Sequence, residues 1–128
     1  MEPLKITSPQ KHTPDVELDS ASGILTFSGQ CYIDNAEKFF RPIFEWIDEY
    51  LEEPGKSILF EMQLDYFNTS SAKCIWEMFL RFEKYCKEKN GNVLINWYFE
   101  EDDENTRELF EDFKAEVDLR FEHIASSW

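Results

Sequence analysis

The sequence lacks the short motifs on which common catalytic and nucleotide-binding sites are built. It contains no G-x-S-x-G elbow, no Walker A loop and no G-x-G-x-x-G fingerprint, and its four glycines are scattered. A serine or threonine nucleophile needs a base within reach, yet the two histidines, His12 and His123, lie in no catalytic motif. An enzymatic function is therefore disfavoured, and we expect no cofactor.

Cysteine and long apolar runs are also scarce. The three cysteines, Cys31, Cys74 and Cys86, form neither a C-x-x-C pair nor a metal-ligand spacing, and their odd number does not suit a disulfide framework. We expect buried, reduced thiols. No apolar run is long enough to cross a bilayer, and the first sixteen residues carry no signal-peptide h-region. These absences predict a cytosolic, cytoplasmic protein.

Positive charge is the third scarcity. The chain carries 13 Lys and Arg against 27 Asp and Glu, which gives a net charge of −14. Such a surface repels phosphate backbones and anionic lipid headgroups, so nucleic-acid and membrane binding are disfavoured. The acidic run 100–104 lacks the alternating spacing of a calcium loop, so we expect no metal site there. It is interpreted as a solvated helix start, with an electrostatic docking surface as the alternative.

Apolar and aromatic residues are plentiful, at 42% and 16% of the 128 residues, which is typical of a folded domain with its own core. Runs rich in β-branched and aromatic residues, bounded by turn residues, predict strands. The expected strands are Gly23–Ser28, Ser57–Phe67 and Asn92–Phe99, with short edge strands at Leu4–Thr7 and Val16–Asp19 and a closing strand at Asp118–Ile124.

Helical spacing of apolar residues separates these strands. The expected helical segments are Ala36–Leu51, Ala72–Cys86 and Leu109–Val117. Asp34 and Glu37 resemble a capping box for the first helix, and Pro42 is expected to kink or split it. Alternation of strands and helices predicts an α/β fold, a mixed β-sheet packed with about three α-helices, as a single domain over residues 1–128.

A polar cluster, Asn68-Thr69-Ser70-Ser71, joins the end of the second long strand to the second helix. One hydroxyl there would suffice to cap the helix and stabilise it by about 1 kcal/mol. The others are spare, and a spare hydroxyl at a helix N-terminus is a plausible phosphoacceptor, because free N–H groups and the helix dipole stabilise a dianion. This local chemistry is compatible with both helix capping and a phosphorylation switch.

Trp46 falls at the edge of the apolar stripe of the first helix, next to Glu45 and close to Glu49. A partly exposed aromatic residue among carboxylates suits a partner surface, so Trp46 is a candidate contact residue. Trp76 lies on the apolar stripe of the second helix, and we expect it in the core.

Three segments in the same order carry a family resemblance: DNAEKFF followed by RPIFEWIDEY, then LDYFNTSSAK, then WYFEEDDENTRELFEDF. Together they resemble the SiaC family of bacterial regulatory phosphoproteins, relatives in fold of the STAS domains of anti-sigma-factor antagonists. The resemblance runs from about Leu4 to Ile124. It implies a STAS-like partner-switching module that a Ser/Thr kinase of the anti-sigma-factor type phosphorylates and a PP2C-type phosphatase restores. Its unphosphorylated form would bind a diguanylate cyclase and promote cyclic-di-GMP synthesis.

The resemblance also implies site residues. The SiaC-type acceptor is a threonine in the N-T-S-S setting, which is Thr69 here, with Ser70 or Ser71 as possible substitutes. Asn68 and Ser71 replace the Asp and Gly of the general STAS pattern, which favours a SiaC-like protein. The alternative is a STAS-like antagonist that binds an anti-sigma kinase without any cyclase. The expected partner-binding residues are Asn68, Thr69, Ser70, Ser71, Lys73 and Trp46.

Overall fold

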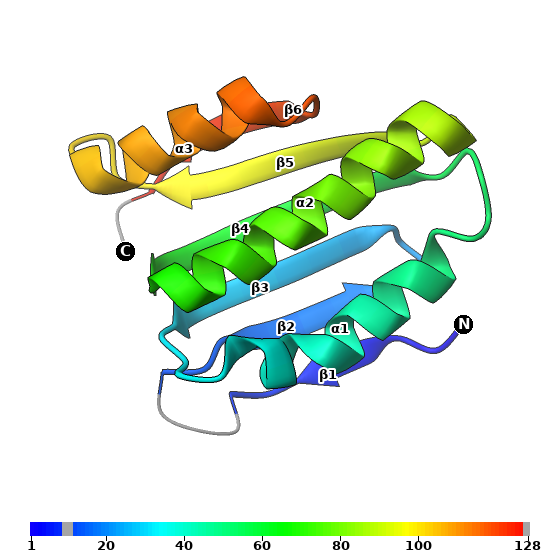
Figure 1. Cartoon of the computed structure of the whole chain (residues 1–128), viewed down its shortest axis with the longest axis horizontal. Helices are drawn as coiled ribbons and strands as arrows, with labels where there is room; N and C mark the ends of the chain where they lie inside the picture. Colours follow the sequence, from blue (N-terminus) through cyan, green and yellow to red (C-terminus); the bar gives the residue numbers. More distant parts are fainter. Residues whose placement is uncertain (9–11, 127–128) are drawn as a thin grey trace.

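The computed structural model describes residues 1–8 and 12–126, apart from the side chain of residue 65. Within these residues the chain forms six strands and three helices (Figure 1). The strands are β1 (Leu4–Ile6), β2 (Asp15–Asp19), β3 (Ile24–Cys31), β4 (Ser57–Phe67), β5 (Asn92–Phe99) and β6 (Arg120–Ala125). The helices are α1 (Ala36–Tyr50), α2 (Thr69–Lys89) and α3 (Glu104–Glu116).

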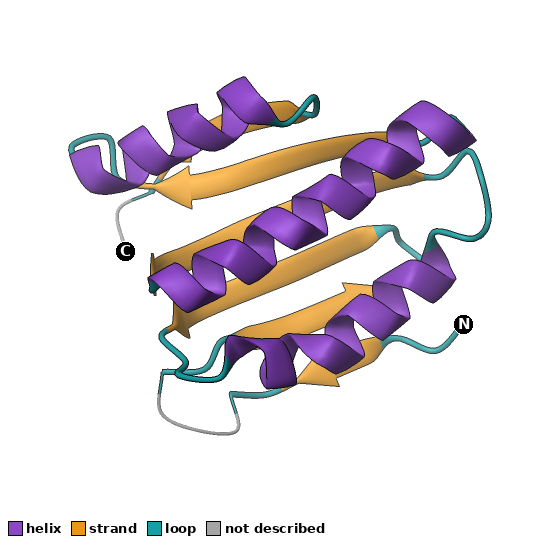
Figure 2. Ribbon diagram, in the orientation of Figure 1, coloured by secondary structure: helices purple, strands orange, loops and turns teal. Residues whose placement is uncertain are grey.

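The strands form one mixed sheet in chain order, β1-β2-β3-β4-β5-β6. The first three strands pair antiparallel, and β3 to β6 pair parallel. One helix connects each successive parallel pair. Because parallel crossovers are right-handed and each new strand is added on the same side, the three helices lie on one face of the sheet. Figure 2 shows all three in front of the strands. The predicted α/β fold class is confirmed.

Aromatic side chains fill the space between the sheet and the helices. The ring of Phe60 in β4 lies 5.3 Å from Phe27 and 5.7 Å from Phe79, measured between centroids. Trp97 in β5 is fully buried and stacks on Phe110 of α3 at 5.7 Å. Rings in these geometries add to the stability that comes from their buried area. The high aromatic content of the sequence is thus used mainly in the core.

The expected N-cap of α1 is wrong, and so is the expected split of the helix at Pro42, while a kink there stays a prediction. Asn35, not Asp34, is the N-cap, because its Oδ1 accepts a hydrogen bond from the Lys38 amide at 3.3 Å. The helix also continues through Pro42 without being divided. The Pro42 ring is exposed, so it costs one backbone hydrogen bond near the helix start, while Phe40 and other fully buried residues hold the helix on the sheet.

Candidate functional site

The candidate site lies where β4 passes into α2, at the carboxyl end of two parallel strands. β3 and β4 end side by side, with Cys31 paired to Phe67. The Asn68 amide then donates to the Cys31 carbonyl at 3.2 Å, and the Asn68 Nδ2 donates to the Ile33 carbonyl at 3.1 Å. Asn68 therefore ties the start of α2 to the loop that follows β3.

Asn68 is also the N-cap of α2. Its Oδ1 accepts a hydrogen bond from the Ser71 amide at 2.9 Å, and its backbone carbonyl accepts from the Ala72 amide at 2.8 Å. The interpretation that a hydroxyl of this cluster caps the helix is therefore wrong. An asparagine cap does the same work, because its side-chain oxygen reaches the same N–H group. All three hydroxyls are left free of a capping role.

The three hydroxyl-bearing residues differ sharply in exposure. Thr69 is exposed, Ser70 is half-buried, and Ser71 is fully buried. Ser71 lies against Cys31, where burial raises the pKa of the Cys31 thiol to about 11 and the neighbouring Ser71 hydroxyl partly opposes that rise. A kinase needs a hydroxyl at the surface, so the geometry offers it Thr69 first and Ser70 second, and not Ser71.

The N-terminus of α2 also differs in charge from the N-termini of the other described helices. The first turns of α1 and α3 contain Glu37 and Glu104, whereas the first turn of α2 contains no acidic residue. The positive end of the α2 dipole is thus not neutralised by its own side chains. Lys73 is exposed and lies four residues after Thr69, on the same face of the helix. This end of α2 is therefore favourable for negative charge.

Two exposed tyrosines border the site, and we call Tyr32 and Tyr66 the aromatic rim. They are 49% and 52% exposed, and their ring centroids lie 5.6 Å apart. The register between β3 and β4 shifts after Gly29, which re-aims the side chains that follow. As a result Phe67, not Tyr66, packs on Trp97, at 6.0 Å. Sequence reasoning missed this rim because alternation alone does not reveal the bulge.

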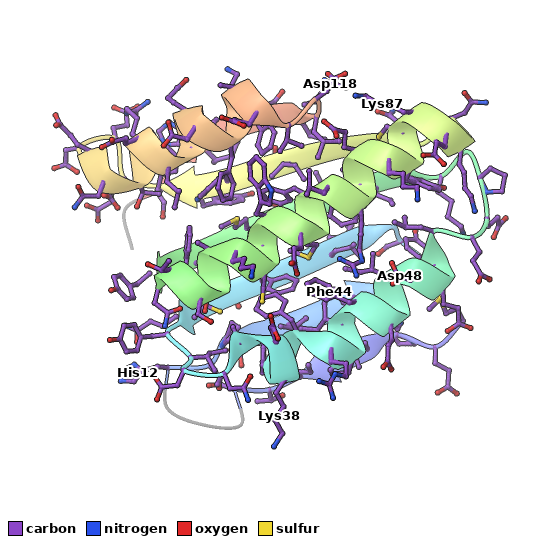
Figure 3. The ribbon with its side chains drawn as sticks, viewed as in Figure 1. His12, Lys38, Phe44, Asp48, Lys87 and Asp118 are labelled. Atoms are coloured by element: carbon purple, nitrogen blue, oxygen red, sulfur yellow. The ribbon has the colours of Figure 1, made fainter. Side chains whose placement is uncertain are left out.

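An open groove of about 820 Å³ begins beside the aromatic rim. Its lining includes Tyr32, Phe39, Lys38 and His12. The His12 Nδ1 lies 2.7 Å from the Gln30 Oε1, and its ring lies 6.0 Å from that of Tyr32. Figure 3 shows His12 and Lys38 at the same end of the molecule. The groove and the rim together give this end both apolar and polar contact area.

Trp46 does not contribute to this surface. It is only 8% exposed, its ring packs on Tyr50 at 5.0 Å, and its Nε1 donates to the Glu2 carbonyl at 2.8 Å. The expectation of a partly exposed contact residue is wrong, because the segment before β1 covers it. Trp76 is half-buried and packs on Phe113 at 5.2 Å, at the margin of the core.

The remaining candidates for chemistry have structural roles. His123 stacks on Phe99 at 3.7 Å, and its Nε2 lies 2.9 Å from the Phe99 carbonyl oxygen. In the acidic run, Asp103 is the N-cap of α3 and accepts from the Thr106 amide at 3.1 Å. Among residues 1–8 and 12–126, no group of three or more His, Cys, Asp or Glu side chains is placed to hold a metal ion. None of the described helices is long and apolar enough to cross a membrane.

Comparison with known proteins points to one family. The family model described as "SiaC family regulatory phosphoprotein" matches residues 7–126. The uncharacterized protein PA14_02130 of Pseudomonas aeruginosa (strain UCBPP-PA14) is 26% identical over 109 residues, which cover 85% of this chain and 86% of that protein. Among solved structures, apo-SiaC from Pseudomonas aeruginosa is 26% identical and covers 98% of this chain and 100% of that chain, with a TM-score of 0.85.

A second structure shares the fold. A chain in the crystal structure of the diguanylate cyclase SiaD in complex with its activator SiaC, also from Pseudomonas aeruginosa, is 24% identical, with a TM-score of 0.86. The match covers 96% of this chain and 99% of that chain. Because the family model spans nearly the whole sequence, the resemblance seen in the three sequence segments is confirmed: the chain belongs to the SiaC family of regulatory phosphoproteins.

Proposed function

We propose that this protein is a phosphorylation-controlled partner switch whose unphosphorylated form binds and activates a diguanylate cyclase. Family membership supports a regulatory role, and a structural relative is described as the activator of the cyclase SiaD. The observation that carries the proposal is the exposed Thr69 at the first position of α2, next to an Asn68 that supplies the cap. In this proposal Thr69 is the acceptor, and Ser70 is the substitute.

Phosphorylation would act here through charge. A phosphate on Thr69 adds about −1.5 to −2 charges. The un-neutralised end of α2 and the exposed Lys73 stabilise that charge in the free protein, so the fold does not need to change. A partner that buries the Thr69 hydroxyl would have to desolvate an unpaired dianion, at a cost of several kcal/mol. At about 1.4 kcal/mol per decade, a cost of about 3–4 kcal/mol lowers the affinity by about 10²- to 10³-fold.

The other components of the switch follow from the same proposal. A Ser/Thr kinase of the anti-sigma-factor type adds the phosphate, and a PP2C-type phosphatase removes it. The protein itself is a non-enzymatic, cytoplasmic regulator acting as one domain over residues 1–128. The cyclase contact includes Asn68, Thr69, Ser70 and Lys73, with the aromatic rim as an additional apolar contact beside them.

The direct test combines phosphosite mapping with binding. Mass spectrometry of the peptide Leu64–Lys73, on protein isolated from its own cells, should find phosphate on Thr69 that a PP2C-type phosphatase removes. Purified protein should bind the cognate cyclase, and phosphorylation should weaken that binding at least 100-fold. Ser70→Ala is the matched control and should respond to the kinase as the wild type does. Thr69→Ala should lose most of the response, and Thr69→Ala/Ser70→Ala should lose all of it.

Two results would contradict the proposal. If the peptide stayed unmodified in every growth condition, Thr69 would have no switching role. If the protein bound an anti-sigma-type kinase but no cyclase, the STAS-like antagonist alternative would replace the proposed function.

A further inference from the structure

The sheet has a second face that the described helices leave uncovered. All three helices lie on one side of the strands, as Figures 1 and 2 show. Parallel sheets occur almost only with both faces covered, and β3 to β6 are parallel. We call the side away from the helices the open face. Its exposure in a parallel sheet suggests that something outside this chain covers it.

A polar row crosses the open face from one edge of the sheet to the other. Successive Cα partners in the sheet define this row, one residue on each strand: Lys5, Glu17, Thr26, Glu61, Asn96 and Glu122. Their chain neighbours, such as Phe27, Met62 and Trp97, are fully buried beneath the helices. Since side chains alternate between the faces of a strand, the polar row points away from the helices.

An apolar row runs beside the polar row. Ile24, Leu59 and Leu94 are Cα partners on the three central strands, two residues before Thr26, Glu61 and Asn96. The two rows are therefore about 6.6 Å apart along the strands. Ile24 is 39% exposed, and Leu59 and Leu94 are half-buried. The open face thus presents an apolar stripe on the three central strands, which Asp19 continues on β2 and Arg120 on β6, beside an acidic stripe that crosses the sheet.

No carboxylate of the polar row forms an ion pair among the described residues, although Lys5 lies opposite Glu17 and Arg120 precedes Glu122 by two residues on β6. The described ion pairs involve Glu53, Asp48, Glu83 and Asp118, none of which belongs to the row. At its centre, the Glu61 carboxylate holds the Tyr98 hydroxyl and raises the pKa of Tyr98.

Two acceptor atoms at the same place have no donor. The second Glu61 oxygen, Oε2, and the Asn96 Oδ1 are buried and have no hydrogen-bond partner in the described residues. A buried acceptor without a donor is costly. Even if the Asn96 amide rotates to donate to Glu61, the row keeps three carboxylates, and its one cation, Lys5, lies on the edge strand β1.

The spacing of the carboxylates indicates the shape of the missing partner. Glu17, Glu61 and Glu122 lie on every second strand, so their Cα atoms are about 9.6 Å apart across the sheet. An α-helix rises about 1.5 Å per residue, so seven residues advance about 10.5 Å. Cations at positions i, i+7 and i+14 of a helix laid across the strands would therefore face the three carboxylates in turn. Apolar residues beside them would face Ile24, Leu59 and Leu94.

We infer that the open face binds a basic amphipathic α-helix of a partner protein, laid across the strands with its cations on Glu17, Glu61 and Glu122. A second copy of this chain fits poorly, because the same three carboxylates would face each other. An anionic membrane is repelled for the same reason. The inference goes beyond the proposed function, since it needs neither phosphorylation of Thr69 nor a cyclase.

Two synthetic helical peptides test the inference on the unmodified full-length protein. The first carries Arg at i, i+7 and i+14 with Leu residues on the adjacent stripe. The second has the same composition, with the Arg residues moved to the side opposite the leucines. Calorimetric titration should give at least tenfold tighter binding of the first peptide, and this advantage should shrink as salt is raised from about 50 to about 200 mM.

Matched charge-removing variants locate the site. Glu61→Gln should weaken binding of the first peptide about five- to tenfold. Glu111→Gln, which removes the same charge from an exposed position on α3, should change the binding less than twofold. Circular dichroism and the unfolding temperature show whether each variant keeps its fold.

Three outcomes would overturn the inference: no binding, equal binding of the two peptides, or equal effects of Glu61→Gln and Glu111→Gln. A dimer in sedimentation that Glu61→Gln dissociates would also overturn it, because a second copy would then be the occupant of the open face. Failure of Thr69 phosphorylation would leave every one of these measurements unaffected.

Discussion

Replacing Asn68 by alanine removes two hydrogen bonds at the start of α2 in a single step. The lost cap bond, from the Ser71 amide to Oδ1 at 2.9 Å, is worth about 1 kcal/mol. The lost bond from Nδ2 to the Ile33 carbonyl at 3.1 Å is worth about another 1 kcal/mol. We therefore expect Asn68→Ala to lower the free energy of unfolding by about 2 kcal/mol. For a chain of 128 residues this corresponds to a fall in Tm of about 7 °C.

Asn68→Asp separates the two contributions. Aspartate keeps the capping oxygen and adds a charge that the helix dipole favours, but it cannot donate to the Ile33 carbonyl. Asn68→Asp should therefore lower the free energy of unfolding by about 1 kcal/mol or less. Urea unfolding at pH 7 measures all the variants, with Thr69→Ala as the control at an exposed position, expected to stay within about 0.5 kcal/mol of the wild type.

The reasoning would be refuted by the opposite order. If Asn68→Ala left the stability within about 0.5 kcal/mol of the wild type while Thr69→Ala cost about 1 kcal/mol, a hydroxyl would be the cap in solution. The separation of capping from the proposed phosphoacceptor would then be lost.

Three further predictions concern the core and its thiols. Ser71→Ala should cost about 1 kcal/mol or less in urea unfolding, because the only hydrogen-bond contact of the buried Ser71 Oγ among the described residues is the weak one with the Cys31 thiol. Trp97→Ala should cost about 3–5 kcal/mol in the same assay, since it empties the centre of the aromatic core. Burial raises the pKa of Cys31 and Cys74 from 9.0 to about 11, so their thiols bind protons more tightly in the folded state. The free energy of unfolding should therefore be unaffected by these thiols below pH 9 and fall between pH 9 and 11, and Cys31→Ala/Cys74→Ala should remove that fall.

The strands and helices were largely predictable because apolar residues recur in them with a clear period. The predicted bounds of β4 and β5 are confirmed to the residue, since strong alternation ends at turn residues on both strands. The start of α2 was predicted late, at Ala72, because its first residues are polar and carry no apolar period. The cap that sets the true start, Asn68, differs from its hydroxyl neighbours only in which side chain reaches the Ser71 amide.

The same holds for the candidate site: features that follow from helical periodicity were predictable, and features that depend on contacts distant in sequence were not. The burial of Ser71 was within reach of the sequence, because Ser71, Ile75, Met78 and Phe82 share one helical face and all are buried. The burial of Trp46 was not, because it depends on Glu2, 44 residues away in the chain. The exposed aromatic rim likewise depends on a bulge between two strands that are distant in sequence.

Asn68 as the cap has a consequence for the lifetime of the protein. Since the side chain that holds the start of α2 is not the one proposed to be modified, and this end of the helix favours negative charge, the phosphorylated form should open locally no more often than the unmodified form. Proteases cleave chains that open, so they should degrade the phosphorylated form no faster than the unmodified one. A cell could then reuse one pool of this protein through many rounds of signalling, without synthesising a new copy for each round.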